Sequence, residues 1–401
     1  MSGRVCRVWR WDRGEVREGE VSGEAMSTVA GRPIRVALSG GGSGGHVYPA
    51  LAVAARLQEG PSPAEVTYLG VASGLEADLV PRAGVPFAPI HAAAWLKPGL
   101  VAKVLGAWHT GRGTWDAWRL LSRVRPDVVL TTGGYVTGPV GLAASWLKIP
   151  LLVHEQNVWP GLTNRLLARR AQLVLTTYAE TARHLPDGIP VRVSGYPVRP
   201  SVAQAQREEA RRQLGLSADW VVVAATGGSQ GAPAVNALMR GLWPLALAEP
   251  NWSVVWATGP RRFDAAVAGL DRDASDRLRV SPYLYDLDVV LAAADVVVGR
   301  AGAGTLAEAA ARALPLVLVP SPHVSEHHQE KNAAAWSERG AALIVPESEA
   351  SRTGPAVVAA LMDDERARRT MGGRAHEMHH AAALDRIAAA VREAAARGGR
   401  G

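Results

Sequence analysis

One three-part pattern occurs twice in this chain, and it restricts the possible folds more than any other feature. A short apolar strand at residues 34–38 is followed by a glycine-rich loop, residues 39–46, and then by an apolar helical segment from Pro49. A second strand at 220–226 is followed by the glycine-rich loop 227–231 and another helical segment. This order is typical of doubly wound α/β domains that bind phosphate at the loop. Two copies predict two such domains that face one another.

A third glycine-rich turn, residues 301–304, lies between an apolar strand at 296–299 and a helix that opens into Leu306. The start of a helix presents unpaired backbone N–H groups and a positive dipole end, so it can hold a diphosphate. Glu308 lies about one turn into this helix and can reach sugar hydroxyls beside the phosphates. The alternative is that Glu308 is an ordinary solvated helix residue. The other glycine-rich turns favour the nucleotide site.

The first glycine loop has a histidine at its end. Gly40, Gly42 and Gly45 match the dinucleotide-binding fingerprint, which also requires an acidic residue at the end of the next strand. That strand, residues 65–70, ends without one, so an NAD-dependent oxidoreductase is disfavoured. The loop still suits a phosphate or a closely approaching sugar. His46 follows the loop at the carboxyl end of a strand, and an imidazole there is a candidate general base.

Four consecutive polar residues follow the apolar strand at 149–153. They are His154, Glu155, Gln156 and Asn157. A buried strand end can satisfy one or two polar side chains by hydrogen bonding, so four in a row indicate the edge of a site.

Composition excludes several classes of protein. The chain is 48% hydrophobic and 20% charged, as expected for a soluble globular protein. The net charge of +7 is no indication of a nucleic-acid partner, because no basic block is interleaved with stacking aromatic residues. Cys6 is the single cysteine, so no intramolecular disulfide can form. His323, His327 and His328 lie close together in the sequence, but no carboxylate or cysteine completes a defined set, so a metal site is not expected.

The N-terminal stretch looks like an addition to the domains. Residues 1–32 carry Arg and Glu throughout and lack the apolar core of a signal peptide, so we expect a disordered extension, with Met26 as an alternative start. No run approaches the roughly 18 apolar residues that a membrane span requires. We therefore expect a cytoplasmic protein.

Residues 91–125 combine tryptophans with an excess of basic residues. Trp95, Leu100, Val104 and Trp108 belong to this segment, and the last three fall on one helical face. One interpretation is an amphipathic helix whose apolar face packs on the core, and it explains much of this apolar pattern. The other interpretation is a patch that settles into anionic lipid head groups.

Eight motifs, in this order along the chain, resemble those of the MurG family, the membrane-associated N-acetylglucosaminyltransferases of peptidoglycan synthesis. They occupy residues 41–46, 133–139, 154–157, 161–164, 197–199, 227–231, 300–308 and 328–333. The resemblance implies an α/β protein of the GT-B type, with two doubly wound Rossmann-like domains facing across a cleft. It implies transfer of GlcNAc from UDP-GlcNAc to the 4-hydroxyl of MurNAc in lipid I, with inversion, to give lipid II.

We expect an N-terminal domain on the acceptor and membrane side at residues 33–198 and a UDP-GlcNAc-binding domain at 199–370. Residues 371–401 are expected to form a C-terminal helix that packs back on the N-terminal domain. Because the acceptor of this family is a lipid, we expect a membrane-contacting patch made of Trp95, Leu100, Val104 and Trp108. Location at the cytoplasmic face of the membrane follows from the same resemblance.

The resemblance also implies roles for single residues. Glu308 would hold the ribose and the Leu284 backbone would read the uracil, with Arg199 beside the nucleotide. Gln329 would hold the GlcNAc, with Asn157 reaching across from the other domain. His46 would be the base, with Glu155 as its competitor. The diphosphate would be held by Ser229 and the helix start at Ala303, Gly304, Thr305 and Leu306, and the transfer point would be faced by Ser43, Gly44 and Gly45.

The chain departs from the family in two places. Tyr196 stands where the family usually has Asn, and residues 1–32 have no counterpart. Other readings are a UDP-GlcNAc 2-epimerase or a diacylglycerol glycosyltransferase on the same scaffold, an oxidoreductase, and a non-catalytic UDP-sugar sensor. No cofactor and no obligatory metal are expected. The expected partners are UDP-GlcNAc, lipid I, an anionic membrane surface and other cell-wall synthesis proteins.

Overall fold

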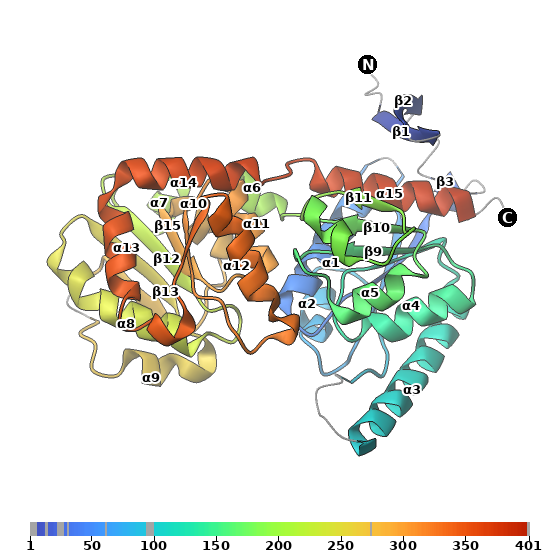
Figure 1. The fold of residues 1–401 in the computed structure, drawn as a ribbon, viewed down its shortest axis with the longest axis horizontal. Coiled ribbons are helices and arrows are strands. Elements are labelled where there is room, and N and C mark those ends of the chain that lie inside the picture. The colour runs from blue at the N-terminus through green and yellow to red at the C-terminus, as the bar shows by residue number, and fades with distance from the viewer. Residues whose placement is uncertain are drawn as a thin grey trace.

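Two α/β domains, each built around a parallel β-sheet, make up most of the chain in the computed structural model (Figure 1). The structure describes residues 6–12, 15–21, 28–29, 32–60, 62–93, 100–272 and 275–398. The expectation of two doubly wound domains is confirmed by the strand order of both sheets.

The N-terminal sheet has seven strands in the order β11-β10-β9-β8-β5-β6-β7. The connection changes direction between β5 and β8, which pair in parallel from Val36 with Val128 to Ser39 with Thr131. Ligands of such sheets bind at this switch point, outside the carboxyl ends of the strands. The strands are β5 (Arg35–Ser39), β6 (Glu65–Gly70), β7 (Phe87–Pro89), β8 (Val128–Thr131), β9 (Leu151–Glu155), β10 (Leu173–Thr176) and β11 (Val191–Val193).

The C-terminal sheet has six strands in the order β14-β13-β12-β15-β16-β17. Its switch point lies between β12 and β15, so the second and third glycine-rich turns of the sequence emerge side by side. The central strands are buried on both faces, which explains their unbroken apolar sequences. The strands are β12 (Val221–Thr226), β13 (Trp252–Ala257), β14 (Leu278–Ser281), β15 (Val296–Gly299), β16 (Leu316–Leu318) and β17 (Ala342–Ile344).

Helices cover both faces of each sheet (Figure 1). Those of the N-terminal domain are α1 (Gly44–Gln58), α2 (Glu76–Arg82), α3 (Leu100–Val124), α4 (Thr137–Trp146), α5 (Leu162–Ala168) and the 3-10 helix η1 (Ala179–His184). Those of the C-terminal domain are α6 (Pro200–Gln204), α7 (Arg207–Gln213), α8 (Pro233–Ala248), η2 (Pro260–Arg262), α9 (Phe263–Val267), α10 (Leu287–Ala293), α11 (Ala303–Ala311), η3 (Ser325–His327), α12 (His328–Glu338), η4 (Glu347–Glu349), α13 (Gly354–Asp363) and α14 (Glu365–Glu377).

The last helix, α15 (Ala383–Gly398), lies against the N-terminal domain although it follows the C-terminal one. Ile387 and Val391 are fully buried in the same apolar cluster as Val36 and Leu38 of β5. An ion pair of 2.7 Å between Arg56 and Asp385 adds a contact to α1. The chain therefore crosses between the domains twice.

The described part of the N-terminal stretch contains two antiparallel pairs. β1 (Cys6–Asp12) pairs with β2 (Glu15–Val21), and β3 (Thr28–Val29) with β4 (Arg32–Pro33). Disorder of residues 1–32 stays a prediction.

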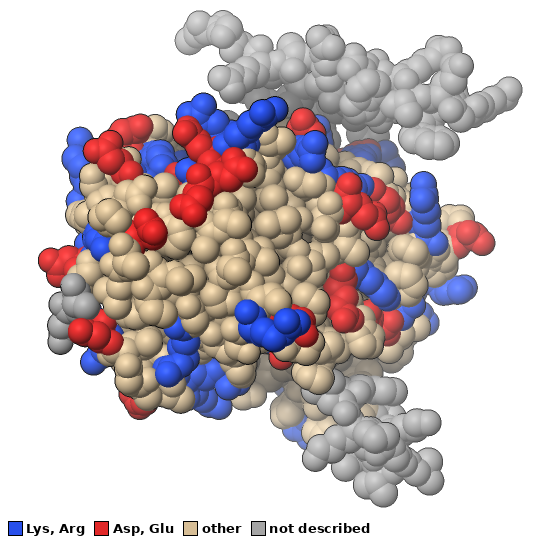
Figure 2. Space-filling view, turned by 60° about the vertical axis from the view of Figure 1, so that its left-hand side comes forward, with Lys and Arg blue, Asp and Glu red and all other residues tan. Residues whose placement is uncertain are grey.

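Figure 2 shows one face of the molecule, on which Lys and Arg are interspersed with Asp and Glu. On the coloured part of this face the basic side chains do not form a continuous surface.

Candidate active site

Two glycine loops meet at the switch point of the N-terminal sheet. The Gly41 N–H donates to the carbonyl of Gly133 at 3.2 Å. Gly134 has a φ of +90°, and a Cβ there would lie 2.1 Å from the Gly41 carbonyl oxygen. Only glycine permits this backbone-to-backbone approach. The loops therefore form a close-packed floor beside the first turn of α1, where Ser43, Gly44 and Gly45 lie.

His46 stands in the first turn of α1, beside the floor of glycines. Its Nδ1 lies 3.0 Å from the Thr132 carbonyl oxygen and 3.3 Å from Oε1 of Gln156. Both oxygens are acceptors, so we assign the proton to Nδ1, which leaves Nε2 with a free lone pair. Burial lowers the pKa of His46, although the nearby Glu155 carboxylate opposes this. The result is a neutral imidazole that can accept a proton.

Glu155, the competing candidate base, is 1% exposed and already engaged. It accepts hydrogen bonds from the N–H groups of Asn157 and Gly161 and from the side-chain amides of Asn157 and Asn164, at 2.8–3.0 Å. Four donors occupy the lone pairs that a proton would need. The carboxylate holds the loop between β9 and α5 in shape, and the geometry favours His46 as the base.

Glu308 lies in α11 and is 8% exposed. Its Oε1 accepts from Nε and Nη2 of Arg199, at 3.2 and 2.9 Å. Burial raises the pKa of Glu308, and the adjacent guanidinium opposes this. The Arg199 guanidinium also lies 5.1 Å from the ring centroid of Tyr48, which comes from α1 of the other domain. Two predicted donor-site residues are thus brought together, with Tyr48 as a neighbour that the sequence analysis missed.

The start of α11 and the loop after β12 lie at one edge of the C-terminal sheet, because β12 and β15 are parallel neighbours. Ala303 and Leu306 are buried, whereas Gly304 and Thr305 are half-buried at the first turn. Ser229 is half-buried in the glycine loop. Leu284 packs against the apolar cluster that contains α11.

Asn332 of α12 joins the two domains at the site. Its Oδ1 accepts from the Val158 N–H at 3.0 Å, and its Nδ2 donates to Oδ1 of Asn157 at 3.0 Å and to the Ala301 carbonyl at 3.1 Å. The side chain is fully buried. Asn157 was expected to reach across from the other domain, whereas no role was predicted for Asn332. Asn332 follows the predicted site residue Gln329 by three positions, which places both on the same side of a helix. This spacing was the sequence signal that could have identified Asn332.

Gln329 lies one turn before Asn332 in α12. Its Oε1 accepts from the Ser321 N–H at 2.9 Å, which fixes the amide in the loop between β16 and α12. Among the side chains that the structure describes, no group of three His, Cys, Asp or Glu could hold a metal ion.

The comparisons with known proteins agree over both domains. Residues 36–176 match the glycosyltransferase family 28 N-terminal domain, and residues 222–389 match the glycosyltransferase family 28 C-terminal domain. A relative from Moorella thermoacetica is 44% identical over 79% of this chain and 86% of its own length. It is called UDP-N-acetylglucosamine--N-acetylmuramyl-(pentapeptide) pyrophosphoryl-undecaprenol N-acetylglucosamine transferase.

A relative of the same name from Desulforudis audaxviator is 41% identical over 92% of this chain and all of its own length. The crystal structure of Acinetobacter baumannii MurG superimposes with a TM-score of 0.70 and 27% identity, over 90% of this chain and 100% of that one. The chain belongs to the MurG family of glycosyltransferases.

In this MurG-family chain, α3 extends from the N-terminal domain (Figure 1, lower right). Trp108 is 57% and Trp115 is 60% exposed on it. Of the other residues predicted for the membrane patch, Trp95 lies outside the described residues. Leu100 and Val104 belong to α3, but their side chains lie outside the description. Within the described ranges, no helix has both the length and the apolar character needed to cross a membrane.

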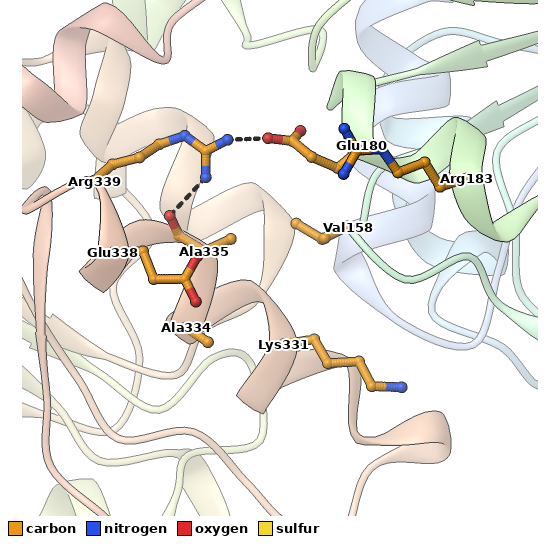
Figure 3. A pocket seen from close by; sticks show the side chains of 8 residues that line it. All are labelled: Val158, Glu180, Arg183, Lys331, Ala334, Ala335, Glu338 and Arg339. Atoms are coloured by element: carbon orange, nitrogen blue, oxygen red, sulfur yellow. Dashed lines mark hydrogen bonds and ion pairs between the residues drawn. The ribbon is translucent and has the colours of Figure 1, made fainter.

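A separate pocket of about 660 Å³ opens between the domains (Figure 3). Val158, Glu180 and Arg183 form its N-terminal side, and Arg339 reaches Glu180 across it. The other wall is formed by Lys331, Ala334, Ala335 and Glu338 of α12. None of the predicted site residues lines this pocket.

Proposed function

We propose that this protein transfers N-acetylglucosamine from UDP-GlcNAc to the 4-hydroxyl of MurNAc in lipid I, with inversion, and so forms lipid II. Relatives whose names state this activity match the chain over 86% and 100% of their own lengths, which supports the assignment. The observation that carries it is the position of His46, whose Nδ1 faces two acceptor oxygens, in the helix that lies against α11 of the C-terminal domain.

The proposed reaction needs one base. Nε2 of His46 takes the proton of the acceptor hydroxyl as its oxygen attacks the anomeric carbon of GlcNAc. The bond from that carbon to the UDP oxygen breaks on the opposite face, which inverts the configuration. UDP leaves with its charge held by backbone N–H groups at the start of α11 and in the loop that contains Ser229.

The remaining side chains position the substrates in this proposal. Glu308 holds the ribose hydroxyls, with Arg199 as its charged partner, and the Leu284 backbone reads the uracil. Gln329 and Asn157 hold the GlcNAc. Ser43, Gly44 and Gly45 leave room for the acceptor, because a larger side chain would narrow the approach to His46.

The acceptor in this proposal is anchored in a membrane. Trp108, with Arg112 5.8 Å from its ring centroid, gives α3 the aromatic and basic character of a surface that contacts anionic lipids. We therefore place the protein at the cytoplasmic face of the bacterial membrane as a peripheral enzyme. Contacts with other cell-wall synthesis proteins are part of the same proposal.

The direct test is transfer of label. Purified protein is incubated with radiolabelled UDP-GlcNAc and a lipid I analogue, and labelled lipid is separated from nucleotide. We expect labelled lipid from the wild type and from His91→Ala, an exposed histidine whose ring contacts Asp116 on α3. We expect His46→Ala to reduce turnover by roughly 10²–10⁴-fold, the usual contribution of a general base.

Three results would contradict the proposal. UDP release without labelled lipid would indicate an epimerase or a hydrolase instead. Full turnover by His46→Ala would remove His46 from the chemistry. A UDP-sugar sensor would bind UDP tightly and transfer nothing.

A further inference from the structure

A chain of hydrogen bonds runs from His46 to the segment that joins the two sheets. Gln156 presents Oε1 to Nδ1 of His46 at 3.3 Å, and its Nε2 lies 2.7 Å from the Thr132 carbonyl and 3.0 Å from Nδ1 of His154. The chain ends where Nε2 of His154 meets the Gly195 carbonyl at 3.0 Å. His154 and Gln156 are each 1% exposed.

The chemistry of these groups fixes where each proton lies. The Gly195 carbonyl can only accept, so Nε2 of His154 carries a proton. Burial lowers the pKa of His154 to about 4, so the ring is neutral and its Nδ1 is an acceptor. Nδ1 of His154 and the Thr132 carbonyl therefore both require N–H groups from Gln156. If the Gln156 amide were flipped, its oxygen would face Nδ1 of His154 and the Thr132 carbonyl, and neither of these groups can donate a proton. Oε1 therefore faces His46.

We propose that His154 and Gln156 are positioning residues that hold His46 in the tautomer with its proton on Nδ1, so that Nε2 stays free for the acceptor proton. Gln156 acts twice, since it faces the ring directly and also holds the Thr132 carbonyl that faces the same nitrogen. The inference rests on the proposed function only for the role given to His46.

The arrangement differs from buried polar groups that merely satisfy each other. Each link has one allowed direction, set by the Gly195 carbonyl at one end and the Thr132 carbonyl at the other, because both groups can only accept. Removal of Gln156 leaves a water or a void beside His46, and the ring then loses one of the two acceptors that select its tautomer. A purely structural role for Gln156 would change stability but not the proton position on His46.

The test combines a spectrum with kinetics. Protein labelled with ¹⁵N-histidine is examined by long-range ¹H–¹⁵N NMR, which distinguishes the two neutral tautomers of each ring. We expect His46 to be protonated on Nδ1 in the wild type and to populate the other tautomer in Gln156→Leu and His154→Phe. We expect these variants to lower kcat about 10- to 100-fold, while the KM for UDP-GlcNAc stays close to that of the wild type.

Ser194→Ala is the matched control. The Ser194 hydroxyl is also buried and also donates to the Gly195 carbonyl, at 3.0 Å, but its bonds go to backbone carbonyls and not to the side chains of His154, Gln156 or His46. It should change neither the His46 tautomer nor kcat. If Gln156→Leu fails to fold, as judged by its melting curve, Gln156→Asn keeps the amide but withdraws it by one methylene and should produce the same two effects.

Two outcomes would overturn parts of this scheme and can be told apart. An unchanged His46 tautomer in folded Gln156→Leu and Gln156→Asn would overturn the positioning role. A changed tautomer with unchanged kcat would support the positioning of His46 but remove it as the base, which contradicts the proposed mechanism. The NMR result stands even if the wild type makes no labelled lipid, because it requires no substrate.

Discussion

Two buried glutamates at the site have opposite surroundings. Glu155 accepts four hydrogen bonds from its own loop, whereas the contacts of Glu308 come from Arg199, which is 109 residues away in the sequence. A carboxylate saturated by amides is a structural anchor. One that is paired with a single guanidinium can exchange that partner for ligand hydroxyls. The surroundings, rather than the residue type, separate the two roles.

Glu308→Gln should therefore weaken nucleotide binding without loss of the fold. Hydrogen bonds to a charged group contribute about 1.5–3 kcal/mol each, so we expect the Kd for UDP to rise roughly 10- to 100-fold. Isothermal titration calorimetry measures the change. The control is Glu347→Gln, because Glu347 also pairs with an arginine, Arg300, in the same domain. Its affinity for UDP should be closer to that of the wild type. Equal affinity in Glu308→Gln would contradict the ribose contact.

His154 should make the protein sensitive to mild acid. Its pKa is lowered to about 4 by burial, so the unfolded chain binds a proton at higher pH than the folded chain does. Stability is then complete above about pH 6.5 and is lost as the pH falls toward 4. We expect this residue to remove about 2 kcal/mol from the free energy of unfolding between pH 7 and pH 5. Urea melts at both pH values should show a smaller loss in His154→Phe.

The sequence allowed the positions of the site residues to be predicted but not their partners. His46, Glu155 and Glu308 could be located because each follows or begins a recognisable strand, loop or helix. The pairing of Arg199 with Glu308, the place of Tyr48 and the bridge made by Asn332 could not, because these contacts join segments that lie far apart in the chain. No local sequence pattern shows which distant segments of the chain come into contact.

At the scale of elements, strands inside the sheets were predictable and two edge strands were not. β6 and β15 coincide with their predicted ranges, but β7 and β17, of three residues each at the edges of the two sheets, were missed. Such strands form because a neighbouring strand supplies their hydrogen bonds, not because their sequences are strongly β-forming. Within α3, Ala117 and Leu121 are buried, whereas Trp108 and Trp115 are exposed. The described residues of the helix therefore form a packed face and an exposed face.

Exposed tryptophans on α3 should contribute to membrane binding. The double change Trp108→Ser and Trp115→Ser removes two large apolar side chains, and burying one such side chain is worth roughly 1.5–3 kcal/mol. We expect affinity for vesicles that contain anionic phospholipid to fall about tenfold or more. Vesicle co-sedimentation measures it. The control is Leu245→Ser, an exposed apolar side chain on α8 of the other domain. Equal losses in both variants would argue against a patch on α3.

At the scale of the whole molecule, a small set of side chains holds the two domains together beside the site. Glu326 of the C-terminal domain accepts from Nε1 of Trp159 at 3.2 Å and from Arg165 at 3.1 Å. Nζ of Lys331 lies 3.5 Å from the centroid of the Trp159 ring. These contacts add to the bridge that Asn332 makes between the domains, and the sequence alone does not reveal them.

Glu326→Ala should loosen this contact. Small-angle X-ray scattering of the ligand-free protein should show a larger radius of gyration than in the wild type, because partly exposed ion pairs of this kind hold domains only weakly. UDP should reverse part of the increase if it bridges the domains. Glu330→Ala, which removes only a pair with His327 within the same domain, is the control. Identical scattering from Glu326→Ala and the wild type would show that other contacts set the arrangement.

The two segments that cross between the domains touch each other. Gly195 has a φ of +85°, and a Cβ there would lie 2.3 Å from Cβ of His380, on the return crossing that leads to α15. A body tethered by two chains at one place can swing about that place but cannot slide away from it. In the proposed function, the C-terminal domain could then swing open to release spent nucleotide and take up another without separating from the N-terminal domain.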